Sequence, residues 1–321
     1  MNFTNFVGVD VAKNKIDIFN LKTNEHMTIA NRTKGIEKTF SKIEKEGTLV
    51  LLENTGGYEK NCIDALIQLG FAIHRTENRS FKSYIRSLGQ KAKTDLIDAK
   101  ALAQYGQERQ KDLKLYQKPA ETDEELKQLL TYLEELKKQR AAHKNRLQSP
   151  GYWDIKDIIE ETIRRLDEII TQIENKIKEL IKKSKKISKK IEGMLSYKGV
   201  SLTTATKIVV YLTEIGEIQT RKVVALSGLA PYVRESGTLK MYTTTSGYGR
   251  SKVKSALYMA ALSAIRFNEK ISSFYKRLLA NGKKKKVALV ACMRKMIILL
   301  NAIVRDGFNK ELTQNTGGVS C

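Results

Sequence analysis

The sequence has few of the residues that mark several common classes of protein. There are 3 prolines, 3 histidines and 3 cysteines among 321 residues, and Cys62, Cys292 and Cys321 lie far apart. Neither a disulfide framework nor a zinc site follows from that spacing, so a reducing cytoplasm is the expected location. The histidines show no ligand spacing either, and histidine-dependent catalysis is therefore not expected.

Long apolar runs are also lacking. None approaches the roughly 18–20 residues needed to cross a bilayer, and the polar residues 1–5 do not resemble a signal peptide. A membrane-spanning segment is therefore not expected. With 41% hydrophobic residues, however, the chain is far from the composition of disordered proteins, and its length suggests about two domains with proper cores.

Acidic residues are the scarcer charged type. The chain contains 58 Lys and Arg against 35 Asp and Glu, which gives a formal net charge of +23. Residues 191–321 hold 21 of these basic residues and 7 of the acidic ones, so the last part of the chain carries +14 of the total. A charge of this size indicates a polyanionic partner, for which nucleic acid is a better candidate than an anionic membrane.

The first hundred residues alternate between strand-like and helix-like patterns. Residues 6–11 are β-rich and residues 15–19 alternate at period two, which together predict a hairpin. Residues 48–52 form a continuous apolar run, as expected of a strand buried on both faces, and residues 71–74 predict a further strand. This order favours an α/β domain with a mixed sheet, which we assign to residues 1–118.

Long helices are predicted after that domain. Leucines and isoleucines recur at helical spacing with a break at Pro150-Gly151, which predicts an antiparallel helical pair or coiled coil over residues 119–188. This linker is a structural spacer, a dimerisation arm, or both. A mainly helical C-terminal domain over residues 189–310 and a flexible tail over residues 311–321 complete the predicted architecture.

Four acidic residues stand at the ends of predicted elements. Asp10 ends one strand, Glu53 ends another, and Asp95 and Asp98 lie at a helix start capped by Thr94. The three-residue spacing places the two aspartates on one helical face. Carboxylates that converge from two strands and one helix suit Mg²⁺, and two such ions can hold the attacking and leaving oxygens of a phosphodiester displacement. Taken singly, each acid is more simply a turn or helix-start residue.

The order Asp, Glu and then Asp-x-x-Asp resembles the DEDD RuvC-like domain of the IS110-type transposases. These are bridge-RNA-guided insertion-sequence recombinases, related to Piv-type DNA invertases. The matching stretches are VGVDVAK (7–13), ENTGGY (53–58) and KTDLIDA (93–99). The resemblance implies an RNase H/RuvC-like fold for the first domain. It also implies that the same four acids are catalytic and bind Mg²⁺, in a site capable of holding two ions.

The C-terminal domain resembles the second domain of the same family. The stretches LSGLAPY (226–232) and RESG (234–237) lead through a β-like run into a basic helix that carries ALYMAA (256–261). In the family the serine of the Ser-Gly pair is the nucleophile, and it maps onto Ser236. Composition alone would make Ser236 an ordinary turn serine, since no histidine or lysine is spaced to activate it. The resemblance suggests the activator, metal-bound carboxylates brought from another subunit.

Basic residues of this domain are expected to hold nucleic-acid phosphates. The candidates are Arg234, Arg250, Lys252, Lys254, Lys283, Lys284, Lys285 and Lys286, although the four-lysine run is as well explained by a solvated loop. Residues 193–205 indicate helix, tight glycine turn and helix, and resemble a helix-hairpin-helix. The family's usual Pro-Gly-Ile-Gly turn is replaced here by YKGVS, so a phosphate-holding role and an ordinary helical hairpin are both open.

The resemblance therefore predicts an RNA-guided DNA recombinase. Ser236 attacks a DNA phosphodiester, a covalent phosphoserine link forms, and strand exchange follows. A noncoding bridge RNA encoded by the element pairs with donor and target double-stranded DNA, so that base pairing supplies the sequence specificity. Composite active sites and the pairing of two DNA sites imply dimers that assemble into a tetramer.

Three other functions were weighed. A metal-dependent RuvC-like nuclease or junction resolvase would need no serine nucleophile. A sugar-kinase or actin-like ATPase would share the VGVDVA strand, but its Asp-x-Gly strand and its Gly-Gly adenosine loop are not found in suitable context. A basic nucleic-acid-binding scaffold would explain the charge but would leave the four acids without a role, because carboxylates near phosphates repel unless a metal intervenes.

Overall fold

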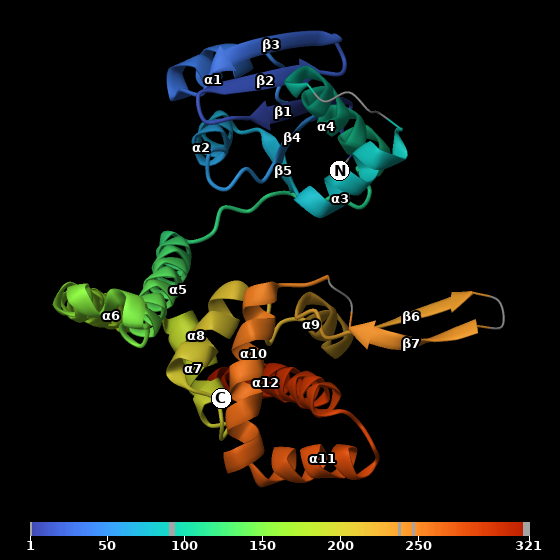
Figure 1. Ribbon diagram of the computed structural model, residues 1–321. Helices are drawn as coiled ribbons and strands as arrows, with labels where there is room; N and C mark the ends of the chain where they lie inside the picture. The colour runs from blue at the N-terminus through green and yellow to red at the C-terminus, as the bar shows by residue number, and fades with distance from the viewer. Residues whose placement is uncertain (1, 90–93, 237–238, 246–247, 317–321) are drawn as a thin grey trace. The chain divides into compact units, whose positions relative to one another are not determined.

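A computed structural model describes residues 2–89, 94–236, 239–245 and 248–316, with the backbone alone at 232–236, 239–244 and 308–316. The chain divides into two compact units, Met1–Lys118 and Pro119–Cys321. The first is an α/β domain and the second is mainly helical (Figure 1). The predicted fold class, a mixed-sheet α/β domain followed by helices, is confirmed.

The N-terminal unit is built on a five-stranded mixed sheet in the order β3-β2-β1-β4-β5. The strands are β1 (Asn5–Val11), β2 (Lys15–Asn20), β3 (Glu25–Ala30), β4 (Thr48–Glu53) and β5 (Ala72–Thr76). The first three are antiparallel neighbours, whereas β4 runs parallel to both β1 and β5. Val11 faces Ile16 in the register of β1 and β2, so the predicted hairpin is confirmed.

Helices cover both faces of this sheet. They are α1 (Thr33–Phe40), α2 (Lys60–Leu69), α3 (Asn78–Ser87) and α4 (Asp95–Arg109). Alternate residues of a strand point to opposite faces, so Val7 and Val9 pack with α1 and α2, while Phe6 packs with α3 and α4. Two apolar cores result, which is why β1 and β4 show nearly continuous hydrophobic runs.

The edge strand β3 was not predicted from the sequence. Its residues alternate between exposed and partly covered positions, and its sequence EHMTIA contains no apolar run. An edge strand with one solvent-exposed face needs no continuous apolar run, because only alternate side chains pack against the rest of the protein.

The second unit begins with two long antiparallel helices joined by a 3₁₀ turn. They are α5 (Glu121–Leu147) and α6 (Lys156–Lys183), and the turn is Pro150–Ile155. Ion pairs cross between them from Lys137 to Glu174 at 2.6 Å and from Lys176 to Glu125 at 2.8 Å. Buried leucines of α5 and isoleucines of α6 belong to the same apolar core as the helices that follow. The helical pair predicted from the leucine and isoleucine spacing is therefore present.

The remaining elements complete this core and add one hairpin. They are α7 (Lys185–Leu195), α8 (Leu202–Tyr211), α9 (Thr220–Leu226), β6 (Pro231–Ser236), β7 (Leu239–Thr245), α10 (Ser251–Phe267), α11 (Glu269–Ala280) and α12 (Lys285–Thr316). The strands β6 and β7 form an antiparallel hairpin that extends away from the helices of this unit (Figure 1).

One helix is long and apolar enough to cross a membrane by length and composition alone. Among the described residues it covers 285–307 of α12, and it was not predicted from the sequence because Arg294 and Lys295 interrupt the apolar run. Half of its apolar window is buried inside the unit, where Cys292, Met296 and Leu300 are fully buried. Its place in the helical core accounts for its apolar character.

Candidate active site

Asp10 and Glu53 lie at the same edge of two neighbouring strands. β1 and β4 run parallel, and Val9 pairs with Leu52, which places Asp10 and Glu53 one position further along each strand. Because side chains alternate along a strand, both acids belong to the sheet face that α4 covers. Two predicted site residues thus come together through the register of the sheet.

A glycine in β1 lets α4 approach this face closely. A Cβ atom at Gly8 would lie 1.9 Å from the carbonyl oxygen of Ala99 and 2.6 Å from the amide nitrogen of Ala103. No side chain fits in that space, and the helix backbone therefore lies directly on the strand. Since Gly8 precedes Asp10 by two residues, the contact lies next to the acidic edge.

The direction of α4 brings its first turn to the same place. Gly106, near the end of the helix, lies against Phe6 at the start of β1, where an added Cβ atom would be 3.0 Å from the ring. The helix therefore runs antiparallel to the strand. Its first turn, which carries Asp95 and Asp98, lies at the strand end that carries Asp10.

These four acids, which we call the acidic cluster, share one electrostatic environment. Burial, followed by the negative charges of Asp98, Asp95 and Glu53, raises the pKa of Asp10 to about 6. Carboxylates that repel one another in this way are stabilised by a bound cation, and oxygen ligands suit hard divalent ions. The donor set therefore fits a metal such as Mg²⁺.

The side chains of the cluster are not arranged around a common point. No three His, Cys, Asp or Glu side chains in the described part of the chain lie close enough together to hold a metal ion as they stand. The Lys15 ammonium is hydrogen-bonded to Asp95 and lies 3.5 Å from Oδ2 of Asp17. The positively charged Lys15 thus already contacts Asp95, one of the four acids of the cluster.

Lys15 and Asp17 were not singled out from the sequence. Asp17 pairs with Asp10 across β1 and β2, and its charge also raises the pKa of Asp10. Asp17 is 4% exposed, and its Oδ1 accepts a hydrogen bond from Thr28 Oγ1 at 2.6 Å and lies 3.0 Å from His26 Nε2. The predicted hairpin contained the available signal, because its register places Asp17 opposite Asp10.

Burial by itself would raise the pKa of Asp17. Hydrogen bonds to Thr28 and His26, together with the charge of Lys15, outweigh burial and hold that pKa below its usual range. Asp17 is therefore ionised at neutral pH beside the acidic cluster.

A buried glutamate shapes the loop that follows Glu53. Glu59 is 4% exposed, and its Oε2 accepts hydrogen bonds from the Gly57 amide at 2.8 Å and the Thr55 hydroxyl at 2.9 Å. Burial raises the pKa of Glu59, but the backbone and hydroxyl hydrogen bonds hold it below its usual range. Glu59 could not be predicted from the sequence, because its partners are mostly backbone amides, which no residue pattern displays.

Ser236 lies on the other unit. It is the last residue of β6 and pairs with Leu239 of β7, while Gly237 of the predicted Ser-Gly pair lies outside the described residues. Arg234 pairs with Met241 in the same hairpin, and for both Ser236 and Arg234 the backbone alone is described. The predicted nucleophile and the acidic cluster thus belong to different units of the chain.

Two predicted phosphate contacts are engaged inside the second unit. The Arg250 guanidinium donates to both carboxylate oxygens of Glu214, at 2.5 and 2.6 Å. The Lys252 ammonium donates to the hydroxyls of Thr131 at 2.9 Å and Tyr211 at 3.0 Å, which ties α10 to α5 and α8. In this state both side chains hold helices and turns together.

The four lysines of the predicted run are more accessible than Arg250 and Lys252. Lys283 and Lys284 lie in the turn after α11, Lys285 and Lys286 begin α12, and all four are exposed. Lys254 Nζ lies 3.4 Å from Thr245 Oγ1. The predicted sites of phosphate contact therefore lie at separate places, at the end of the hairpin's second strand and at the start of α12.

The glycine turn between α7 and α8 is present and is used for packing. Gly199 has a φ of 104°, and a Cβ atom there would lie 2.7 Å from the Cα of Ala264 in α10. The neighbouring Lys198 carbonyl accepts a hydrogen bond from Asn268 Nδ2 at 3.3 Å. These contacts favour the ordinary helical hairpin, because one side of the turn rests on α10.

Two family models match the chain, one in the α/β unit and one in the helical unit. The IS110-type DEDD transposase model matches residues 7–150, and the model described as Transposase IS116/IS110/IS902 family matches residues 192–276. The chain belongs to the IS110 transposase family. Members of such DEDD families generally use divalent metal ions, which agrees with the donor set of the acidic cluster.

Curated relatives extend this likeness over nearly the whole transposase. The pilin gene-inverting proteins of Moraxella lacunata and Moraxella bovis are each 26% identical over 320 residues, which is 96% of the transposase and 98% of each relative. Two solved structures of Thermus thermophilus RuvC, one titled as a complex with Holliday junction substrate, match 35% of the transposase and 100% and 99% of their own chains. Their identities are 11% and 12%, and their TM-scores are 0.28 and 0.27.

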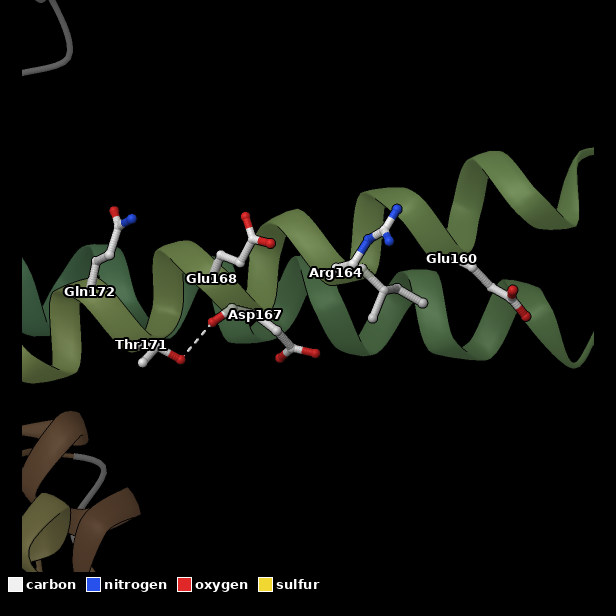
Figure 2. A pocket seen from close by; sticks show the side chains of 7 residues that line it. Glu160, Arg164, Asp167, Glu168, Thr171 and Gln172 are labelled. Carbon is white, nitrogen blue, oxygen red and sulfur yellow. Dashed lines mark hydrogen bonds between the residues drawn. The ribbon is translucent and has the colours of Figure 1, made fainter.

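A surface depression of the transposase lies on α6 (Figure 2). Its lining is Glu160, Ile163, Arg164, Asp167, Glu168, Thr171 and Gln172. All of these residues come from one helix, and Asp167 is also hydrogen-bonded to Arg140 of α5. Ligand sites normally gather polar groups from several elements, so this surface resembles the solvated side of a helical pair.

Proposed function

We propose that this transposase cuts and rejoins DNA through a covalent phosphoserine link at Ser236, in a site completed by the acidic cluster. The main support is the convergence of acids from β1, β4 and α4, where burial, followed by the charges of the other acids, raises the pKa of Asp10. Family membership supports a DNA reaction. The relatives named for pilin gene inversion favour recombination between two DNA sites over simple cleavage.

In the cleavage step, the Ser236 oxygen forms a bond to a DNA phosphorus atom and gives up its proton. The bond from phosphorus to one sugar oxygen breaks, and that oxygen takes up a proton. Rejoining is the reverse, in which a sugar hydroxyl of the new partner strand attacks the phosphoserine and the serine is released. The number of phosphate ester bonds is the same before and after, so strand exchange needs no outside energy source.

Asp10, Glu53, Asp95 and Asp98 would hold Mg²⁺, in a site with capacity for two ions. When bound, Mg²⁺ lowers the pKa of a nearby hydroxyl and stabilises the negative charge that develops on phosphate oxygens. Asp17, which pairs with Asp10, and Lys15, which contacts Asp95, lie beside this cluster. Ser236 and the acids belong to different units of the chain, and in this proposal acids from another subunit complete each site in a dimer. The pairing of two DNA sites then implies that dimers assemble into a tetramer.

The nucleic-acid partners in this proposal are donor and target double-stranded DNA and a bridge RNA encoded by the element. The charge of +14 over residues 191–321 supports a phosphate-rich partner for the second unit. Arg234, Lys254 and the run Lys283 to Lys286 are the proposed contacts. Arg250 and Lys252 can contact phosphate only if their hydrogen bonds to Glu214, Thr131 and Tyr211 are broken.

The nature of the DNA product tests the proposal. The transposase, purified with any RNA it binds, is incubated with DNA that carries donor and target sites, and the products are compared before and after protease digestion. We expect a protein–DNA adduct that is lost in Ser236→Ala and retained in Ser255→Ala, a matched exposed serine on α10. Asp98→Ala should abolish the DNA chemistry while RNA binding persists. Free 5′-phosphate ends made by Ser236→Ala would instead support a metal-dependent nuclease.

A further inference from the structure

The hairpin β6–β7 joins the helical part of its unit at two glycines. Gly228 precedes β6 with a φ of 67°, and Gly249 follows β7 with a φ of 127°. A Cβ atom at Gly249 would lie 2.3 Å from the Gly228 nitrogen, so the two backbones touch without room for a side chain. The Arg250 amide donates to the Leu226 carbonyl at 2.8 Å. We call this crossing, residues 226–230 and 248–250, the hairpin root.

An ion pair fastens the root to the turn after α8. Nη1 and Nη2 of Arg250 donate to the two oxygens of Glu214 at 2.5 and 2.6 Å, and Nη1 also donates to the Tyr211 carbonyl at 3.1 Å. Paired contacts of this kind fix both the distance and the orientation of a guanidinium. Their hydrogen bonds are the main reason that the pKa of Glu214 falls to about 2.

Ser236 lies at the end of β6 that is farther from the hairpin root, so a small rotation at the root displaces it by a large distance. From Pro231 to Ser236 the strand extends by about 17 Å, at about 3.4 Å per residue. A rotation of about 10° at the root would therefore move the serine by about 3 Å, whereas a misplacement of about 1 Å can lower a reaction rate about 10²-fold. Among the described elements, β6 and β7 pack chiefly against each other, so the root governs where the hairpin points.

We propose that Glu214 is a positioning residue for the nucleophile, because it fixes the direction of the hairpin through Arg250. The proposal rests on the function proposed above for Ser236. It gives Arg250 a task at the hairpin root, apart from any contact with phosphate. Both carboxylate oxygens of Glu214 are hydrogen-bonded to the Arg250 guanidinium, and Glu214 acts through that contact.

The same turn offers a matched control. Glu217 is three residues away and its Oε1 accepts from Lys190 Nζ at 3.0 Å and from Lys186 Nζ at 2.9 Å, both on α7. This ion pair fastens the turn to α7 and makes no contact with the hairpin root. Glu217→Gln therefore removes a comparable charge from the same turn without releasing Arg250.

The experiment compares Glu214→Gln, Arg250→Lys and Glu217→Gln in the full chain with its RNA. Three quantities are measured: the single-turnover rate of adduct formation, the affinity for DNA, and hydrogen exchange of the Arg250 amide. For Glu214→Gln we expect faster exchange at that amide and an adduct rate about 10- to 100-fold lower, with DNA affinity changed by less than about 3-fold. Glu217→Gln should keep the wild-type exchange at the root and an adduct rate within about 3-fold.

An adduct rate at the wild-type level in Glu214→Gln would overturn the positioning role, as would an equal loss of rate in Glu217→Gln. If Glu214→Gln does not fold, Arg250→Lys, which keeps the charge and loses the paired geometry, gives the same test. Ser236→Ala is run in parallel to separate the two proposals. Adducts that persist in Ser236→Ala reject the proposed function, while exchange at the Arg250 amide still shows whether Glu214 holds the hairpin.

Discussion

Gly8 lies directly beneath the carbonyl group of Ala99, so close that a Cβ atom on the glycine would be 1.9 Å from that oxygen. This contact sets the height of α4 above the sheet. Because the first turn of α4 carries Asp95 and Asp98, the same contact decides how near those two carboxylates come to Asp10. The acidic cluster thus depends on a residue that has no functional group.

Replacement of Gly8 should therefore separate the cluster. We expect Gly8→Ala to lower the free energy of unfolding by about 3 kcal/mol or more, because the strand and helix backbones must move apart. The matched control is Gly35→Ala in α1, where an added Cβ atom would meet only the Ala30 oxygen at 3.6 Å and should stabilise the helix by about 0.5–1 kcal/mol. Urea unfolding measures both, and similar losses in the two variants would contradict the special role of Gly8.

Burial of Asp10, together with repulsion from the other acids of the cluster, should make the metal-free protein less stable as pH rises. The pKa of Asp10 is about 6 when folded and 3.8 in its unperturbed state, so the folded protein holds a proton that the unfolded chain has lost. Stability from this group is present below pH 4 and is lost as pH rises to about 6, by at most about 3 kcal/mol. Asp10→Asn should remove this loss.

The measurement for Asp10 is the difference in unfolding free energy between wild type and Asp10→Asn, in chelator, at several pH values from 4 to 7. The variant should become the more stable of the two as pH increases. A difference that stays constant over this range would show that folding does not raise the pKa of Asp10. Added divalent ion should then stabilise the wild-type protein more than the variant.

Lys15 should compete with a metal ion for Asp95. Its ammonium is hydrogen-bonded to that carboxylate, and a cation that takes the same oxygen must displace it. We expect Lys15→Met to tighten Mg²⁺ or Mn²⁺ binding by up to about 5-fold, which is the modest effect of an exposed ion pair. Lys13→Met, in the same turn, is the control. Calorimetric titration measures both, and weaker binding in Lys15→Met would mean that Lys15 helps to form the site instead.

Asp17 should be important for stability independently of metal. Asp17→Ala removes a buried, charged acceptor from the Thr28 hydroxyl and the His26 ring, which lie on the exposed edge strand and can bind water instead, at a cost of about 1–2 kcal/mol. Because the pKa of Asp17 is below its usual range, its contribution is present at neutral pH and is lost as pH falls through the acid range. A variant that unfolds within about 0.5 kcal/mol of wild type would contradict this.

The acidic cluster could be predicted because its members end strong local patterns. Asp10 is the last residue but one of the apolar strand β1, and Glu53 is the last residue of β4. The predicted cap before α4 is confirmed, since Thr94 Oγ1 accepts from the Ile97 amide at 3.3 Å. Such signals lie within a few residues of the site. They require no knowledge of how distant segments pack.

Neither the burial of Asp17 nor the partner of Arg250 could be predicted in the same way. Asp17 lies on the sheet face covered by α4, a helix that begins nearly eighty residues later, and its own sequence, Lys-Ile-Asp-Ile, is that of an ordinary alternating strand. Arg250 was expected to contact phosphate because a basic residue at a helix start shows no sign of a partner. That partner, Glu214, is 36 residues earlier in the chain, and only the folded core brings the two together.

The crossing of Gly228 and Gly249 has a consequence for how this enzyme can be altered. Only backbone passes through that crossing, so the helical core places no limit on the number of residues beyond it. Inserting two residues into β6 and two into β7, at paired positions, would move Ser236 about 7 Å further from the hairpin root. Ser236 would stay on the same face of the hairpin, because side chains alternate with a period of two. The reach of Ser236, the proposed nucleophile, is thus an adjustable length, and recombinases for differently spaced DNA sites could be engineered by changing it while leaving the helices untouched.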